Sequence, residues 1–174
     1  MPNIIGYHAN DSNRCLEFVN YRTIINSEDT YWLGRGMYFW DNLSNAKYWV
    51  SEKRRKAQEV TDWSIVQVNI DIEKLLDLTD DDVLNTLMKL WYQYCAKSHR
   101  STKAPLGKKI DLLFGYFNFL SSNFCTIKGH GKYDREQNEF LVGTYVVSNI
   151  KTIYCVKNGT NLNIYNREFI SEVV

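Results

Sequence analysis

The sequence predicts an α+β fold in a single domain that spans residues 1–174. Three observations lead to this prediction. The length is that of one ordinary domain, and no repeat or Gly/Ser-rich linker divides the chain. Hydrophobic residues make up 44% of the chain, which favours a packed core over disorder. Helical and strand-like periodicities both occur without regular alternation, which is typical of α+β proteins rather than of βαβ folds.

The first third of the chain predicts two short strands and two helices. "NIIGYH" at residues 3–8 predicts a strand, and the cap-type residues that follow predict a helix within 10–20. The run "MYFW" at 37–40 predicts a second short strand. Residues 43–57 predict a helix because apolar side chains occur at positions 46, 49 and 50, and Ser44 is a suitable N-cap.

The remainder of the chain continues this mixture. Residues 63–71, "WSIVQVNID", alternate and are rich in β-branched side chains, which predicts a strand. Residues 79–97 begin with cap-type residues and continue with helical spacing, which predicts a helix. We expect a polar loop from Ser98 to Gly107. We also expect a short strand at 110–114, followed by a helical turn. Two further strands are expected at 138–147 and 150–157.

Charge and cysteine content exclude several classes of protein. The net charge of +1 provides no overall basic field for nucleic acid. The four cysteines are Cys15, Cys95, Cys125 and Cys155; none forms a C-x-x-C pair or has a histidine at zinc-ligand spacing. We therefore expect four buried, reduced thiols and no metal. No run approaches the roughly 20 apolar residues of a membrane span, so we expect a cytoplasmic protein that does not bind membranes.

The stretch "LGRGMYFW" at residues 33–40 places two glycines directly before bulky aromatic residues. A dinucleotide-binding G-x-G-x-x-G fingerprint would need glycine where Phe39 occurs, and would lead into a helix rather than a strand. Neither "PLGKKI" nor "KGHGKYD" satisfies the P-loop pattern. Two interpretations remain: a tight turn into a buried strand, and a binding pocket that combines closely approaching backbone with a flat aromatic wall.

Three sequence blocks occur in an informative order: "GYHAN" at 6–10, "LGRGMYFWDNLSNAKYW" at 33–49 and "QNEFLVGTYVV" at 137–147. Together they resemble the signature of the H-Y-E group of ADP-ribosyltransferases, which includes poly(ADP-ribose) polymerases and diphtheria toxin. The resemblance implies a split β-sheet fold with flanking helices and NAD as the co-substrate, without a metal. The triad residues that match are His8, Tyr38 and Glu139.

The resemblance also implies a role for each triad residue. His8 would hydrogen-bond the adenosine-side ribose, and Tyr38 would flank the nicotinamide ring. Glu139 would stabilise the oxocarbenium-like sugar that forms when the nicotinamide–ribose bond breaks. Glu136 is the alternative carboxylate if the register differs. Gln137, two residues before Glu139, would lie on the acceptor side.

The other cofactor-binding residues implied by the resemblance surround this triad. The backbone of Ala9, where the family usually has glycine, would hold the nicotinamide amide. Gly34 and Gly36 would let the chain turn close to the pocket. Tyr48 matches the second family tyrosine, and Ser44 replaces a small hydroxyl residue that the family places nearby.

Basic residues between 97 and 109, near three aromatic residues of the preceding helix, slightly favour nucleic acid over protein as the acceptor. Arg100 and Lys103 are the candidate acceptor contacts. We therefore expect a mono-ADP-ribosyltransferase that modifies RNA, DNA or protein. The small size is typical of bacterial or phage toxins and defence effectors, for which a neutralising antitoxin protein is an expected partner. The alternatives are a NAD glycohydrolase and a non-catalytic binding module.

Overall fold

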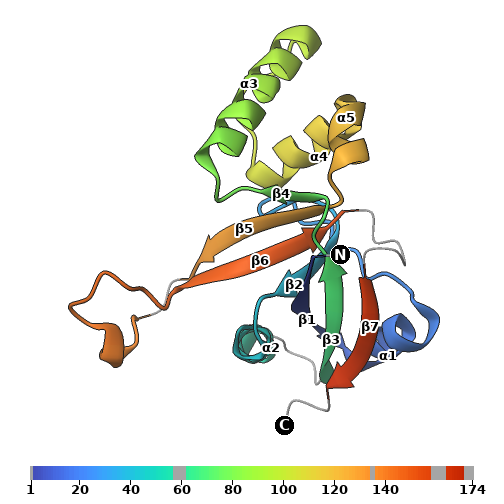
Figure 1. Cartoon of the computed structure of the whole chain (residues 1–174), viewed down its shortest axis with the longest axis vertical. Coiled ribbons are helices and arrows are strands. Elements are labelled where there is room, and N and C mark those ends of the chain that lie inside the picture. Colours follow the sequence, from blue (N-terminus) through green and yellow to red (C-terminus); the bar gives the residue numbers. More distant parts are fainter. Residues whose placement is uncertain (1, 57–61, 134–135, 158–163, 171–174) are drawn as a thin grey trace.

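The computed structural model describes residues 2–56, 62–133, 136–157 and 164–170, and within them the predicted α+β class is confirmed. Helices flank a mixed seven-stranded sheet (Figure 1). The strands are β1 (Asn3–Asp11), β2 (Met37–Trp40), β3 (Trp63–Asp71), β4 (Leu75–Asp77), β5 (Thr126–Lys132), β6 (Ile150–Val156) and β7 (Ile164–Ile170). The helices are α1 (Ser12–Tyr21), α2 (Leu43–Lys56), α3 (Asp81–Ser98), α4 (Leu106–Tyr116), α5 (Asn118–Asn123) and the single 3₁₀ turn η1 (Glu139–Leu141).

The sheet has the strand order β4-β5-β6-β2-β1-β3-β7 and consists of two well-paired groups that meet at a narrow join. β1 pairs with β3 along its whole length, and β2 pairs with β6 at all four of its residues. β1 and β2, by contrast, pair at one position, Tyr7 opposite Trp40. Figure 1 shows β5 and β6 running across the direction of β1, β3 and β7. The two groups therefore diverge on either side of this pair.

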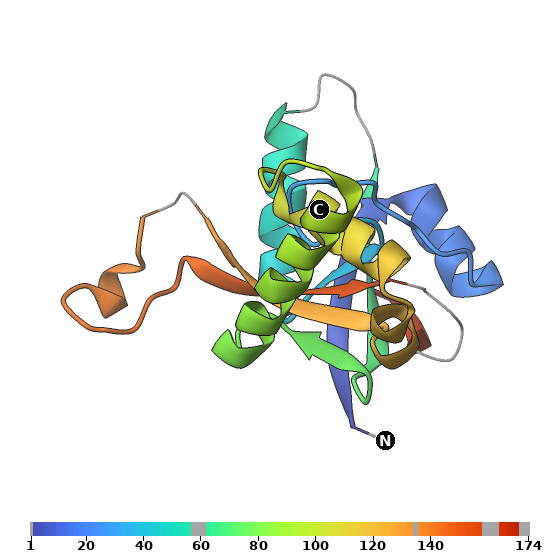
Figure 2. The ribbon, with the colours of Figure 1, turned by 90° about the horizontal axis from the view of Figure 1, so that it is seen from above.

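Helices on both sides bury the group that contains β1. The apolar side chains of α1, Cys15 and Phe18, pack with Met37, Phe39 and the inward residues of β3. On the other side, Ala46 and Val50 of α2 pack with Ala9 and Ile65. Because both faces of β3 are covered, its consecutive residues Ile65 and Val66 are both fully buried. Figure 2 shows α1 and α2 separated across the sheet.

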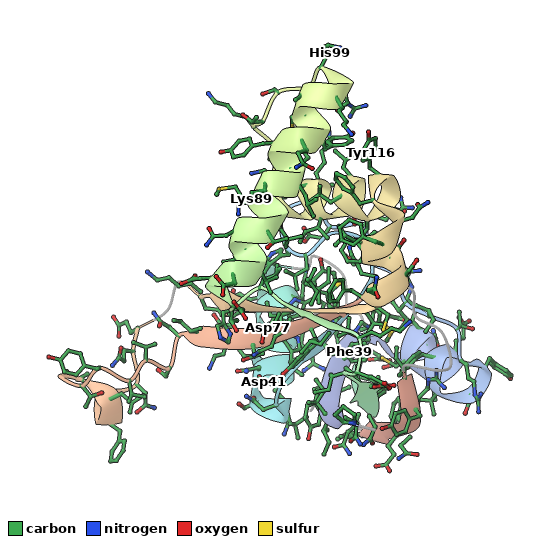
Figure 3. The ribbon with its side chains drawn as sticks, turned by 45° about the horizontal axis from the view of Figure 1, so that its top comes forward. Phe39, Asp41, Asp77, Lys89, His99 and Tyr116 are labelled. Atoms are coloured by element: carbon green, nitrogen blue, oxygen red, sulfur yellow. The ribbon has the colours of Figure 1, made fainter. Side chains whose placement is uncertain are left out.

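The helices α3, α4 and α5 form a lobe beside β4 and β5 (Figure 3). Its own small core contains Trp91, Tyr94, Cys95, Leu113 and Leu120. A second cluster, which includes Ile110 of α4 with Leu76, Ile127 and Ile153, joins this lobe to the sheet. The lobe is thus a layer packed on the β4–β6 half of the sheet.

The predicted strand at 110–114 is wrong, because this segment lies inside α4. Gly107, Ile110 and Leu113 are its buried residues, and their spacing of three places them on one face of a helix. Pro105 precedes the first turn, where a missing backbone N–H costs nothing. The short apolar run fits a buried strand and a buried helix equally well in sequence, and packing against the sheet selects the helix.

The predicted strand at 138–147 is also wrong. This stretch contains η1 and belongs to a segment, residues 136–149, that we call the arm; Figures 1 and 2 both show it extending away from the sheet. The Gln137 side-chain amide donates to the carbonyls of Leu141 and Val146, at 2.7 and 3.0 Å. Gly143 turns the chain with φ of +80°. Local side-chain hydrogen bonds thus replace the ladder that a strand would need.

The other predicted elements are confirmed over their described residues, with shifts at their ends. They are the helices at 10–20, 43–57 and 79–97 and the strands at 3–8, 37–40, 63–71 and 150–157. Residue 57 lies outside the described residues. Asp11 caps α1 and Asp80 caps α3. The sequence did not predict β4, β5 or β7. In β5, Gly131 weakens the strand signal, yet a β-carbon there would lie 2.5 Å from the Trp32 ring, so close packing requires the glycine.

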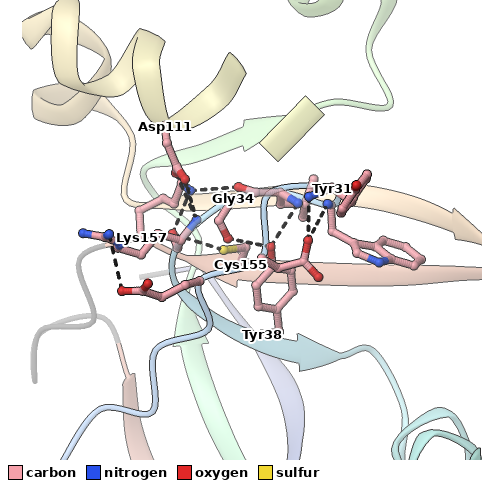
Figure 4. Close-up of polar contacts among 11 residues, drawn as sticks. Tyr31, Gly34, Tyr38, Asp111, Cys155 and Lys157 are labelled. Carbon is pink, nitrogen blue, oxygen red and sulfur yellow. Dashed lines mark hydrogen bonds and ion pairs between the residues drawn. The ribbon is translucent and has the colours of Figure 1, made fainter. Parts of the chain in front are cut away.

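The glycine turn at residues 33–36 connects the sheet to α4 (Figure 4). Gly34 has φ of +81°, and a β-carbon added there would lie 2.4 Å from an Asp111 carboxylate oxygen. That carboxylate accepts a hydrogen bond from the Arg35 backbone N–H at 3.0 Å. The buried ammonium of Lys157 donates to Asp111 and to the carbonyls of Leu33 and Arg35, at 2.7, 2.8 and 2.7 Å respectively. The turn is therefore fixed against both α4 and the end of β6.

We predict that Gly34→Ala lowers the free energy of unfolding by about 2–4 kcal/mol, because a left-handed backbone and a steric overlap add together. Gly115→Ala is the matched control: Gly115 lies in α4 with open space around it, so the same change should raise stability by about 0.5–1 kcal/mol. Urea unfolding at equilibrium measures both. Equal effects at the two positions would contradict the role assigned to the turn.

Candidate functional site

A cavity of about 370 Å³ opens beside the join between β1 and β2. Its walls come from β1, β2, α1, α2 and the connection between α1 and β2. Tyr133, which follows β5 and precedes the arm, completes them. The aromatic residues that line it are Trp32, Tyr38, Trp40, Trp49 and Tyr133. Its polar and charged lining residues are His8, Asn10, Arg14, Asn26, Ser27, Asp29 and Lys53.

His8 joins the two groups of strands at this cavity. Its Nδ1 lies 2.7 Å from the Tyr38 carbonyl oxygen, which can only accept, so Nδ1 carries the proton. Its Nε2 lies 3.3 Å from the side-chain amide nitrogen of Asn10, which donates. Burial lowers the pKa of His8 from 6.5 to about 4, against a smaller opposing effect of the Tyr38 carbonyl. The imidazole is therefore neutral at physiological pH, with a defined tautomer.

Tyr38 is held at its hydroxyl as well as at its backbone (Figure 4). The hydroxyl donates to the Gly34 carbonyl at 2.6 Å and accepts from the Leu33 backbone N–H at 3.0 Å. Burial raises the pKa of this hydroxyl well above its usual value, so it stays protonated and keeps the donated hydrogen bond. With both ends of the side chain fixed, the ring presents a rigid surface to the cavity.

The aromatic wall of the cavity is centred on Tyr133. Its ring centroid lies 6.2 Å from that of Trp32 and 5.9 Å from that of Trp40. Tyr48 meets it edge-on at 5.8 Å. The Tyr133 hydroxyl is buried and has no hydrogen-bond partner within the described residues, and burial raises its pKa. A buried donor of this kind is suited to a polar ligand group.

Two exposed cations and one half-buried carboxylate complete the cavity. Arg14 comes from the first turn of α1, and Lys53 comes from α2 with its ammonium 5.1 Å from the Trp49 ring centroid. Asp29 accepts from the backbone N–H groups of Tyr31 and Trp32, at 2.6 and 3.0 Å, which fixes the loop that presents Trp32. Flat rings together with cations suit a ligand that combines aromatic rings with negative charge.

The structure brings several of the predicted site residues together and separates others. His8, Ala9 and Tyr38 all line the cavity, and Tyr48 contacts its wall through Tyr133. Gly34 lies behind Tyr38, against Gly107 and Asp111 of α4.

Gly36, with φ of +154°, lies against Cys155 and Val156 of β6, where a β-carbon would be 2.6 Å from the Cys155 sulfur. Both glycines thus position Tyr38 from behind the cavity. The Ser44 hydroxyl donates to the side-chain oxygen of Asn42 at 2.8 Å. Asn42 also accepts from the Asn45 backbone N–H, so Asn42 caps α2 and the predicted cap at Ser44 is wrong.

The predicted catalytic carboxylate and acceptor residues lie farther from the cavity. Glu139 is exposed in η1 on the arm, and Glu136 is exposed near the start of the arm. Gln137 holds the arm's internal turns. Arg100 and Lys103 are exposed in the connection beyond the end of α3, which Figure 3 marks at His99. The expected strand beginning at Glu139 is absent from the described structure, and Glu139 does not line the cavity.

Sequence reasoning missed most of the aromatic wall. Trp32 and Tyr133 each lie next to a glycine-containing segment of the sequence. Neither belongs to a motif that includes His8, and no sequence pattern links the two residues to each other. Asp29 and Lys53 likewise carry no motif. The one available signal was the surplus of aromatic residues, 14% of the chain, which indicates stacking surface without locating it. Only the packing of the α1–β2 connection against β5, where Trp32 lies against Gly131, brings Trp32 and Tyr133 together.

None of the four cysteines forms a disulfide bond. Cys15, Cys95 and Cys155 are buried as predicted, whereas Cys125 is only partly buried. The described residues contain no cluster of three or more potential metal ligands. Among the helices described, none is long and apolar enough to cross a membrane. Comparison with family models, with curated proteins and with solved structures finds no match to this chain.

We predict that His8 makes stability depend on pH. Its pKa is lower in the folded state, at about 4 against 6.5, so the unfolded chain binds the proton first as the pH falls. The contribution of His8 is complete above pH 6.5 and is lost as the pH falls toward 4. Between pH 7 and 5 we expect a loss of about 2 kcal/mol, at roughly 1.4 kcal/mol per pH unit below 6.5.

Urea unfolding of the wild type and of His8→Asn at both pH values measures this effect. Asparagine does not titrate and can still donate toward the Tyr38 carbonyl. The difference between wild type and variant should therefore shrink at pH 5. An unchanged difference would show that His8 is not a buried neutral imidazole.

Proposed function

We propose that the cavity binds NAD and that the protein transfers ADP-ribose from NAD to a macromolecule. The observation that carries this proposal is the convergence of His8, Ala9 and Tyr38 on one aromatic and cationic cavity. These residues belong to two separate sequence blocks of the resemblance, and nothing in their spacing requires them to share a cavity.

The chemistry of the cavity is compatible with a dinucleotide. NAD offers two flat rings and a pyrophosphate, and the cavity offers aromatic walls with Arg14 and Lys53 at its edge. Its volume of about 370 Å³ lies within the ~300–1,000 Å³ common for small-molecule sites. The Nε2 atom of neutral His8 is an acceptor that a ribose hydroxyl can share with Asn10. The single pairing of β1 with β2 also supports a split sheet.

The catalytic role of Glu139 requires the arm to move. The arm follows Tyr133, which lines the cavity, and six residues of extended chain span up to ~20 Å. Its tip exposes Phe140, Val142 and Tyr145, with Phe140 90% exposed. Folding this apolar tip onto the aromatic cavity mouth would remove it from water. We propose that NAD favours this closed arrangement and that Glu139 then stabilises the developing positive charge on the ribose.

We predict that Glu139→Gln lowers the rate of nicotinamide release from NAD by about a hundredfold or more, because the variant lacks the charge that stabilises the transition state. Glu136→Gln, on the same arm, is the matched control and should stay within about twofold of the wild type. The assay measures nicotinamide released with and without cell lysate, RNA or DNA.

A third variant, Asp29→Asn, tests the carboxylate that already lies on the cavity. Asparagine keeps a side-chain oxygen for the Tyr31 and Trp32 N–H groups, so the loop should be retained. If Asp29→Asn abolishes release and Glu139→Gln does not, the role assigned to the arm is wrong.

Release that needs no acceptor would favour a NAD glycohydrolase. Absence of release from the folded wild type would leave a binding module.

We predict that Arg14→Gln and Lys53→Gln each weaken binding of NAD and of ADP-ribose about three- to tenfold, because each removes a cation from the pyrophosphate. Nicotinamide, which lacks phosphate, should bind these variants as it binds the wild type. Lys47→Gln, an exposed change elsewhere on α2, is the control. Titration calorimetry measures all three ligands. Equal losses for nicotinamide would contradict a pyrophosphate role.

The biological setting is proposed from the resemblance alone. A transferase of this group would act here as a bacterial or phage toxin or defence effector, with a neutralising protein as its partner.

A further inference from the structure

We propose that the α3–α5 lobe binds single-stranded nucleic acid. The proposal that this strand is the ADP-ribose acceptor rests on the proposed function, whereas the binding itself does not depend on NAD chemistry. The surface consists of the carboxyl-terminal half of α3, the 99–105 connection, and the α4–α5 corner at Tyr116–Phe119. We call it the lobe surface.

The lobe surface carries concentrated and unpaired positive charge. Between Val83 and Ile110 the chain has six Lys and Arg residues and no Asp or Glu, although the whole chain has a net charge of only +1. None of the six forms an ion pair within the described residues. Five are exposed: Lys97, Arg100 and Lys103 on the lobe surface, and Lys89 and Lys108 at its edges. Exposed cations without partners are available to neutralise phosphates.

A row of aromatic rings runs from the core of the lobe to the same surface. Trp91 stacks on Tyr94 with ring centroids 5.5 Å apart, and Tyr94 meets Tyr116 edge-on at 5.1 Å. The row continues from Tyr116 to Phe117 at 4.9 Å and from Phe117 to Phe119 at 5.9 Å. Its inner members, Trp91 and Tyr94, are buried, but Tyr116 and Phe119 are 46% and 49% exposed. The core therefore holds the exposed rings in place.

The charges and rings adjoin one another. Lys97 follows Tyr94 by three residues on α3, so their side chains are neighbours on the helix surface. The Trp91 indole N–H donates to the Thr102 carbonyl at 2.9 Å, which holds the connection carrying Arg100 and Lys103 against the ring row. The Lys109 ammonium lies 5.7 Å from the Trp91 ring centroid. Figure 3 shows Tyr116 beside the part of α3 that ends near His99.

Single-stranded nucleic acid is the polyanion that can contact both the exposed cations and the exposed aromatic rings. Its backbone supplies regularly spaced phosphates, and its unpaired bases supply flat faces that stack on aromatic side chains. A duplex satisfies the cations but hides its base faces. An anionic membrane satisfies the cations and exposed rings, but the acidic first turn of α3, with Asp81 and Asp82, limits the cationic area to one end of the lobe.

The test measures binding of fluorescently labelled 20-nucleotide oligo(dT) and oligo(U) by anisotropy, without NAD. We expect the logarithm of the association constant to fall linearly with the logarithm of the salt concentration. The slope should reach about −3.5 if all five exposed cations contact phosphates, at about −0.7 for each contact. Arg100→Glu/Lys103→Glu should weaken binding at least tenfold and reduce the slope by about 1.4. Lys47→Glu/Lys56→Glu, an equal charge change on α2, should leave binding within about twofold of wild type.

Tyr116→Leu/Phe119→Leu tests the rings while keeping apolar volume in the lobe core. It should weaken binding about tenfold with the salt slope unchanged, because stacking rather than charge is removed. Circular dichroism and thermal unfolding verify that each variant is folded. Absence of binding at 50 mM salt, or equal binding by Arg100→Glu/Lys103→Glu and wild type, would overturn the proposal. Stronger binding to duplex or to phosphatidylserine vesicles than to single strands would also overturn it.

The outcome is separable from that of the proposed function. Binding without nicotinamide release would leave the lobe surface intact and overturn only the transferase. Nicotinamide release without binding would do the reverse. Release stimulated by the oligonucleotide, and lost together with binding in Arg100→Glu/Lys103→Glu, would identify the strand as the acceptor.

Discussion

The fixed position of Tyr38 is the constraint on which the rest of the site depends. Its carbonyl accepts from His8, its hydroxyl is held between Leu33 and Gly34, and its strand pairs with β6. Within the described residues, β1 and β2 share one ladder pair, Tyr7 with Trp40, so the His8 hydrogen bond ties the two groups of strands together where they diverge. The same contacts fix the cavity's wall. A change that releases Tyr38 therefore affects both the sheet and the cavity.

The second shared element is the glycine turn with its polar support. Lys157 and Asp111 hold the turn, and Gly107 lets α4 approach its backbone. Through this contact the lobe of α3–α5 is positioned on the sheet half that carries β6. The buried ammonium of Lys157 has three acceptors within 2.8 Å, which offsets the cost of removing its charge from water. The cavity and the lobe surface thus share one supporting framework while using different side chains.

The proposed chemistry divides the molecule into a rigid part and a part that must move. Buried hydrogen bonds and ring contacts hold the cavity walls, which suits the orientation of a ligand before reaction. The arm is held mainly by its own side-chain hydrogen bonds and exposes its apolar residues. A segment with little burial has a small free-energy difference between alternative positions. In the proposed function, ligand binding would therefore shift the arm without unfolding the sheet.

The sequence alone determined the α+β class, the helices α1, α2 and α3, and the strands with strong alternation, because periodicity and caps are local signals. It also selected His8 and Tyr38, which the fold brings together. Tertiary structure decided the rest. Packing on the sheet made 110–114 helical, and side-chain hydrogen bonds turned 138–147 into an arm that holds Glu139 away from β2. Trp32 and Tyr133 became one wall only through folding, because the contact joins residues a hundred positions apart, and no local pattern encodes such a contact.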